Sequence, residues 1–162
     1  MQTTRGQRQA ERLRAAVAAF VEQIQRVPPE LLARPPKPGE WSLLELAAHS
    51  AEIYPYWAKQ IVWLRQHAGQ PFGRTASDPE RIKFVEEHRS EPLDQLVGAI
   101  QRGSEEAARA LSSYSDSEWE TVTGIHAARG EMHMDGIADL FLAGHAEEHL
   151  RQLRETLAEL QS

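Results

Sequence analysis

Residues 41–49 read WSLLELAAH, and this stretch predicts the start of a long amphipathic helix. Ser42 and Glu45 have the spacing of a capping box, in which the serine hydroxyl and the glutamate carboxylate each accept a hydrogen bond from a free backbone amide. Trp41, directly before the cap, is placed to pack on the first turns as a hydrophobic staple. The apolar spacing continues along one helical face through Leu43, Leu46, Ala47, Ile53, Trp57, Ile61 and Leu64.

Pro55 lies inside this predicted helix, and Gly69 and Pro71 follow its end. Proline removes one backbone hydrogen bond, and its ring clashes with the preceding turn. We therefore expect a kink near Ile53–Trp57, or a boundary between two helices there. The aromatic residues of this region suit either an interface or the protein's own core, and we expect the core for Trp57. They are Tyr54, Tyr56, Trp57 and Trp63.

Three further segments repeat apolar residues at the three- and four-residue spacing of an amphipathic helix. They span about Thr4–Val27, Pro92–Ser113 and Asp135–Leu160. A shorter helix is predicted from Asp78 to His88, because Asp78 is a good capping residue and a proline follows it at the first helical position. Four long amphipathic helices in one chain predict a four-helix bundle.

The region between Tyr114 and Met134 carries a weaker pattern. It is compatible with a helical turn at Ser117–Trp119 and with a loop or small hairpin at Thr121–His133. No stretch alternates polar and apolar residues well enough to require a sheet. We therefore predict one all-α domain over residues 1–162, a four-helix bundle with a long crossover connection between the second and third long helices.

The composition is that of a globular protein with 41% hydrophobic and 26% charged residues. No apolar run approaches the roughly 20 residues that span a bilayer, and the N-terminus lacks the apolar stretch of a signal peptide. We therefore expect a soluble cytoplasmic protein without membrane partners. The net charge of −6 argues against binding to nucleic acid, whose phosphates attract clustered Lys and Arg.

Cysteine is absent from the sequence. This absence excludes disulfides, thiolate ligands to a metal and a cysteine nucleophile. Any thiol chemistry in this protein must therefore use a thiol that a small molecule brings in.

The most informative chemical motif is the run GHAEEH at residues 144–149. His145 and His149 lie one helical turn apart, so their Cβ atoms are about 5–6 Å apart on one face. Both imidazoles can then reach one ion at the zinc–nitrogen distance of about 2.0–2.1 Å. An isolated pair of this kind is more often two ordinary helix histidines, because histidine is common at half-buried positions.

His49 strengthens the metal hypothesis, because it lies on the core-facing stripe of the helix that begins at Ser42. Three inward-facing imidazoles would each need a separate polar partner in an apolar core, whereas one shared cation satisfies all three. Three ligands also leave a coordination position open. Glu45, Glu52 and Glu148 are neighbours that either orient these histidines by accepting an imidazole N–H or are simply solvated.

Two better-known metal patterns are not present. The HExxH motif of zinc proteases fails because Ala146 follows His145. The Glu-x-x-His pairs of di-iron bundles fail because glutamate never stands three residues before a histidine. The four remaining histidines lie near predicted helix ends or in loops, and no role is assigned to them. They are His67, His88, His126 and His133.

The same residues resemble the DinB/YfiT-like superfamily of bacterial four-helix-bundle proteins. The resemblance rests on Trp41-Ser42, Glu45 and His49, and on His145-x-x-x-His149-x-x-Gln152, which Asp135 precedes. It implies a divalent metal, commonly zinc or nickel, on the three histidines, and a homodimer. It also implies that members transfer or use low-molecular-weight thiols, or act as metal-dependent hydrolases, although many have no assigned activity.

These observations leave three functions open, and with them whether the chain is an enzyme. The first is a metal-dependent transferase that delivers a low-molecular-weight thiol to an electrophilic small molecule, with Gln152 orienting the bound group. The second is a hydrolase that uses metal-bound water, with Glu148 or Glu52 as a weak candidate for the base. The third is a non-catalytic dimeric bundle that binds metal for stability or sensing.

Overall fold

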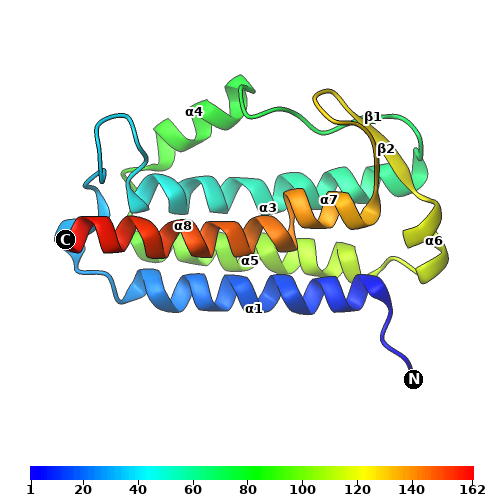
Figure 1. The fold of residues 1–162 in the computed structure, drawn as a ribbon, viewed down its shortest axis with the longest axis horizontal. Coiled ribbons are helices and arrows are strands. Elements are labelled where there is room, and N and C mark those ends of the chain that lie inside the picture. The colour runs from blue at the N-terminus through cyan, green and yellow to red at the C-terminus, as the bar shows by residue number, and fades with distance from the viewer.

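The computed structural model describes all 162 residues, and four long helices form its body. They are α1 (Arg5–Gln25), α3 (Leu43–Gln66), α5 (Leu93–Ser112) and α8 (Ala143–Gln161). The helices lie side by side along the long axis of the molecule, with α1 packed on α5 and α8 and with α3 packed on α5 (Figure 1). The predicted all-α four-helix bundle is therefore confirmed.

The predicted crossover is also present. Helices α3 and α5 run in the same direction, so the chain returns along the outside of α3 before α5 begins (Figure 1). This return segment contains β1 (Pro71–Phe72) and α4 (Pro79–His88). The Asp78 side chain caps α4 by accepting from the amides of Glu80 and Arg81, as the sequence predicts. The short helices α2 (Pro29–Leu32) and α6 (Asp116–Thr121) lie in other connections.

Helix α3 begins as the capping box predicts and runs unbroken through Pro55. The Glu45 amide donates to Ser42 Oγ at 3.2 Å, and the Ser42 amide donates to Glu45 Oε1 at 3.4 Å. The alternative of two separate helices at Pro55 is wrong. Residues on both sides of the proline, Ile53 and Trp57 among them, are buried in the same core, so their packing outweighs the loss of one backbone hydrogen bond.

The last predicted helix, Asp135–Leu160, is divided in two, which corrects the expectation of one continuous helix. Leu142 separates helix α7 (Met134–Phe141) from α8. Its φ of −128° and ψ of −101° are not helical. The two helices approach closely at Gly144, where a Cβ atom would lie 2.0 Å from the Asp139 carbonyl oxygen. Only glycine fits there without displacing the backbone.

A small three-stranded sheet lies beside one end of α3 (Figure 1). Strands β2 (Thr123–His126) and β3 (Gly130–His133) form the antiparallel hairpin that the sequence allowed, and β1 adds to β2 in parallel. The sequence did not predict β1, which has two residues and pairs with a strand more than 50 residues later. The sheet joins the return segment to the hairpin.

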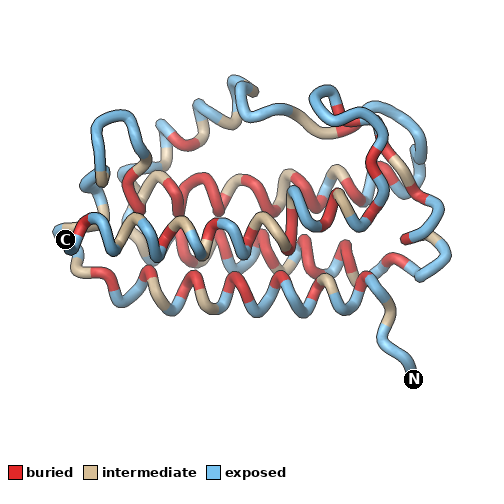
Figure 2. Tube along the Cα trace, viewed as in Figure 1, coloured by how far each residue is buried: buried red, intermediate tan, exposed pale blue.

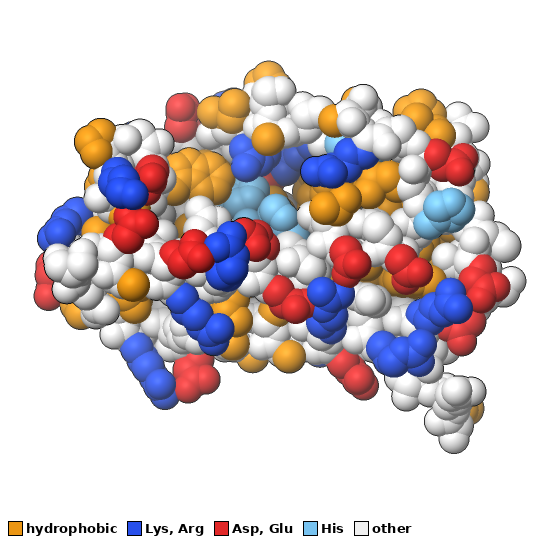
Figure 3. Space-filling view, viewed as in Figure 1, with side chains coloured by type: hydrophobic (Ala, Val, Ile, Leu, Met, Phe, Trp, Pro, Cys, Tyr) orange, Lys and Arg blue, Asp and Glu red, His pale blue; other side chains and the backbone are white.

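The core is one continuous cluster between the four long helices, where the buried positions face inward (Figure 2). Tyr54 and Trp57 belong to this cluster, whereas 41% of the Trp63 surface is exposed. The expectation of a core position for Trp57 is therefore confirmed. Charged side chains of both signs cover the outer faces of α1 and α8 (Figure 3). None of the helices combines the length and the apolar character needed to span a bilayer.

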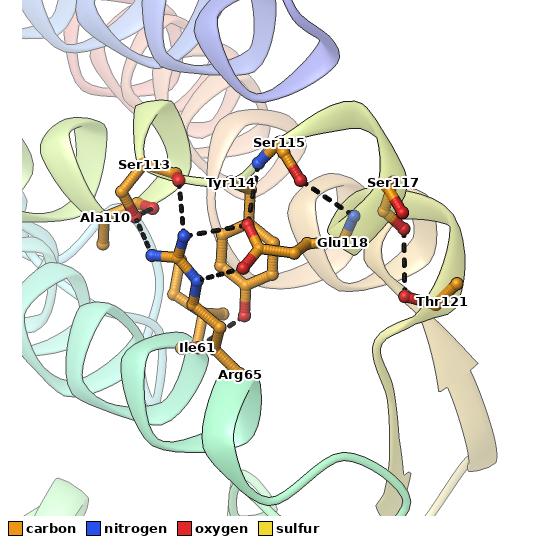
Figure 4. A network of polar contacts seen from close by, with 9 residues as sticks. All are labelled: Ile61, Arg65, Ala110, Ser113, Tyr114, Ser115, Ser117, Glu118 and Thr121. Atoms are coloured by element: carbon orange, nitrogen blue, oxygen red, sulfur yellow. Dashed lines mark hydrogen bonds and ion pairs between the residues drawn. The ribbon is translucent and has the colours of Figure 1, made fainter.

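A polar network ties α6 to the ends of α3 and α5 (Figure 4). Arg65 donates through Nε and Nη2 to the two carboxylate oxygens of Glu118, each at 2.8 Å, and through Nη2 to the Ser113 carbonyl at 2.9 Å. Glu118 also accepts from the Ser115 amide as part of a second capping box. The hydrogen bond with Arg65 and the capping contacts lower the pKa of Glu118 to about 2.

We predict that the Arg65–Glu118 pair makes stability depend on pH. The folded pKa of Glu118 lies below its ordinary value of 4.5, so its contribution is complete above about pH 4.5 and is lost as the pH falls towards about 2. In thermal melts, Glu118→Gln should lower the melting temperature at pH 7, and its difference from the wild type should shrink below pH 4.5. Glu86→Gln removes a carboxylate that makes no ion pair and should behave like the wild type at both pH values. A difference for Glu118→Gln that stays constant from pH 7 to pH 3 would contradict the pairing.

Candidate metal centre

The three predicted ligands meet in the interior of the bundle. His49 comes from α3, and His145 and His149 come from the first two turns of α8. One ring nitrogen from each residue can be chosen so that all three lie within 4.8 Å of one another. The ring centroid of His49 lies 4.9 Å from that of His149 and 5.9 Å from that of His145. His49 and His149 are each 3% exposed, and His145 is half-buried.

The tautomer of His149 follows from its hydrogen bond with Ser50. Ser50 Oγ donates its single proton to the Leu46 carbonyl at 2.8 Å, so it must accept at its 3.1 Å contact with His149 Nδ1. His149 Nδ1 therefore carries the proton, and Nε2 carries the free lone pair. A hydrogen bond to the second ring nitrogen is the usual means of orienting a histidine ligand.

His49 has a polar atom that the protein leaves without a partner. Its Nδ1 is buried and makes no hydrogen bond, the one side-chain nitrogen or oxygen in the chain in that state. An unsatisfied buried polar group costs about 1–3 kcal/mol. Three imidazoles with an unpaired nitrogen among them fit a divalent ion, and imidazole suits zinc, nickel, copper and iron.

The histidines are held in the neutral form that can bind a metal. Burial lowers the pKa of all three, to about 2 for His49 and well below the ordinary value for His149. The positive charge of Arg81 lowers the pKa of each of them further. Their lone pairs are therefore available at neutral pH without the release of a proton.

A pocket of about 340 Å³ opens beside His49 and His145. Its apolar wall includes Trp57 and Phe141, whose rings stack with centroids 4.0 Å apart and planes 6° apart. Residues of the return segment also line the pocket. The lining residues are His49, Ile53, Trp57, Arg74, Thr75, Ala76, Arg81, His126, Ala128, Arg129, Leu140, Phe141 and His145.

His126 joins the return segment to the hairpin beside this pocket by hydrogen bonds. Its Nδ1 accepts from the Ala128 amide at 3.2 Å, so its Nε2 carries the proton and donates to the Arg74 carbonyl at 2.9 Å. Gly73 precedes Arg74 with a φ of +74°, and a Cβ there would lie 2.8 Å from the Trp57 ring. The return segment can therefore rest directly on the aromatic wall.

The three other histidines lie outside the cluster. The ring of His67 stacks on Trp63, His88 contacts Glu91, and His133 lies 3.7 Å from Glu131. None of them lines the pocket.

The weak catalytic candidates from the sequence also lie outside the pocket lining. Glu52 forms an ion pair with Arg74, and both side chains are only 10% exposed. Glu148 is exposed and pairs with Arg151. Gln152 is half-buried and lines a separate pocket with Trp41.

Sequence reasoning missed Ser50 and the pocket arginines. Ser50 stands directly after His49, but its contact with α8 depends on how the two helices pack. Arg81 had a usable signal, because the predicted cap at Asp78 places it in the first turn of α4. The sequence did not indicate that α4 would lie beside the histidines.

Residues 9–153 match the sequence model of the DinB superfamily. YfiT from Bacillus subtilis, described as a probable metal-dependent hydrolase with an unusual four-helix bundle topology, superposes with a TM-score of 0.82 at 10% identity, covering 99% of this chain and 90% of YfiT. The four-helix bundle protein TT2238 superposes with a TM-score of 0.65 at 19% identity, covering 93% of this chain and 98% of TT2238.

A mycothiol-dependent maleylpyruvate isomerase superposes with a TM-score of 0.67 at 14% identity, covering all of this chain but only 64% of the isomerase. At these identities the likeness to solved structures establishes the fold alone. A comparison with curated protein sequences gives no match.

We predict that Ser50 sets the tautomer of His149. In metal-free protein, ¹⁵N NMR of the ring nitrogens should show the proton of His149 on Nδ1. Ser50→Ala removes the acceptor, so the share of the Nε2–H form should rise. Ser104→Ala, at a buried serine that donates only to the Gln101 carbonyl, should leave the spectrum of His149 unchanged. An Nε2–H form in the wild type would show that Ser50 does not orient this ring.

Proposed function

The chain belongs to the DinB superfamily, and we propose that it is a cytoplasmic enzyme that holds zinc or nickel on His49, His145 and His149. We further propose that it transfers a low-molecular-weight thiol to an electrophilic small molecule. The observation that carries this proposal is the buried, unpaired His49 Nδ1 within a cluster of neutral imidazoles that borders a pocket.

The protein groups around the cluster favour a reactive site over a purely structural one. A structural zinc site is closed by four protein ligands, whereas this cluster offers three. His49 and His145 line the pocket, so a small molecule in the pocket would lie next to the ligands. A divalent ion held there would supply a Lewis acid that polarises a bound group and lowers its pKa.

The chain's own residues would prepare this site in two ways. Ser50 orients His149, and the packing of α3 on α8 holds His49 against both other rings. Trp57 and Phe141 give the pocket an apolar wall that limits access of water. Such a wall strengthens electrostatic interactions within the pocket.

The pocket lining favours thiol transfer over hydrolysis, because it contains no carboxylate. A carboxylate within reach of the attacking water would assist a hydrolase as its general base. The nearest predicted candidates, Glu52 and Glu148, are held by Arg74 and Arg151. A thiol loses its own proton more readily than water does, and the chain has no cysteine to supply one. The similar isomerase is described as mycothiol-dependent.

Hydrolysis is the second candidate, because the similar protein YfiT is described as a probable metal-dependent hydrolase.

We also propose a homodimer, as the sequence resemblance implies. The exposed apolar side chains Val62, Trp63 and Ile125 offer a surface for such an association. A non-catalytic metal-binding dimer is the third candidate.

The first test is the metal content of tag-free protein, measured by mass spectrometry. The wild type should contain about one divalent ion per chain after supply of zinc or nickel. His149→Ala should lose it, because two ligands bind a metal far more weakly than three. His67→Ala removes a histidine outside the cluster and should retain the ion. Wild-type protein that cannot be loaded with zinc, nickel, copper or iron would contradict the metal site.

A second measurement separates the three functions in metal-loaded protein. Thiol transfer predicts metal-dependent conjugation of an added low-molecular-weight thiol to a model electrophile. Ester or amide turnover that ignores added thiol would favour the hydrolase. A lower melting temperature of His49→Ala, with no substrate turned over by the wild type, would favour the non-catalytic bundle.

A further inference from the structure

We propose that the pocket binds a small carboxylate and that Arg81 anchors its negative charge beside the histidine cluster. This substrate class rests on the proposed function, since the carboxylate would occupy the pocket next to the metal ligands. It is suggested by an unusual distribution of charge. The chain has 24 acidic and 18 basic residues, yet the pocket is lined by three arginines and no carboxylate.

Arg81 is a cation without a carboxylate partner. Its Nη1 donates to the Ala76 carbonyl at 2.9 Å, and its guanidinium carbon lies 5.4 Å from the centre of the Trp41 ring. It forms no ion pair, although the side chain is half-buried. Burial, followed by repulsion from Arg74, lowers its pKa, and the more distant carboxylates of Glu52 and Asp78 offset this only in part. A partly desolvated guanidinium of this kind gains most from an anionic ligand.

The two other arginines of the lining differ from Arg81. Arg74 is already neutralised by Glu52, and its guanidinium carbon lies 3.8 Å from the centre of the Tyr56 ring. Arg129 is exposed in the turn of the hairpin and forms no ion pair. Arg74 therefore serves as a fixed part of the wall, and Arg129 adds positive charge at the rim. Arg81 is the half-buried positive charge left for a ligand.

The position of Arg81 connects the anion to the candidate metal centre. Arg81 lines the same pocket as His49 and His145. Blue side chains lie directly beside the pale-blue histidines in the hollow of the upper face (Figure 3). One molecule can therefore contact Arg81 through a carboxylate while another of its groups faces the histidines.

The size and chemistry of the pocket define the rest of the ligand. A volume of about 340 Å³ suits a small molecule rather than a polymer. The stacked rings of Trp57 and Phe141 favour a short apolar or unsaturated body. A guanidinium binds a carboxylate through two parallel hydrogen bonds. A neutral analogue would leave Arg81 desolvated and unpaired, so the pocket should reject it.

The test compares phenylacetate with phenylacetamide, which have nearly the same shape and differ in charge. Binding of each is measured by NMR titration on metal-free and on zinc-loaded protein, with metal content determined in parallel. The wild type should bind phenylacetate at least about tenfold more tightly than phenylacetamide in both forms. Arg81→Gln should remove most of this preference without changing the metal content. Arg89→Gln, at an exposed arginine just after α4 that forms no ion pair, should retain the preference.

The outcomes separate this proposal from the metal-dependent function. A preference for phenylacetate that Arg81→Gln leaves intact, or no preference in the wild type, would overturn the carboxylate site even if zinc binds normally. Loss of the preference in Arg81→Gln, in protein that takes up no metal, would support the carboxylate site and overturn the metal function. Tighter binding of inorganic phosphate than of phenylacetate would overturn the carboxylate assignment in favour of a phosphate ligand.

Discussion

Two neighbouring helices that run in the same direction need a connection as long as the helices themselves. Helix α3 has 24 residues and is therefore about 36 Å long, and the chain must cover this distance again before α5 can begin. The return segment cannot pass through the packed core, so it lies outside α3 (Figure 1). The pocket forms between this segment and the bundle, and both Arg74 and Arg81 belong to the segment. The bundle topology thus creates the place where small molecules can be bound.

This arrangement divides the site between rigid and variable parts. The three histidines stand on α3 and α8, whose packing in the core fixes their positions. Arg74 and Arg81 of the pocket lining stand on a connection, where substitutions and changes in length disturb the core least. His126 limits the freedom of that connection by bridging it to the hairpin through both ring nitrogens. This side of the pocket is therefore loop in origin but fixed by hydrogen bonds.

Local signals in the sequence were sufficient for the long helices α1, α3 and α5 and for the pair of histidines on α8. The capping box at Ser42 predicted the first residue of α3, and the four-residue spacing of His145 and His149 placed both rings on one face. The break at Leu142 was missed because apolar residues continue at helical spacing on both sides of it.

The pocket charges were missed for a different reason, since they depend on tertiary contacts. Arg74 and Glu52 are 22 residues apart, so the sequence cannot tell which arginine is neutralised and which has no carboxylate partner.

The break at Leu142 also has a consequence for changes in the length of the chain. A residue inserted in α7 before Asp139 would shift only the start of α7, because the contact between Asp139 and Gly144, and with it α8, would stay in place. A residue inserted between Ser42 and His49 would rotate His49 by about 100° relative to the cap, away from the other two rings. The two halves of the histidine cluster thus differ in their tolerance of length changes, and α3 carries the stricter register.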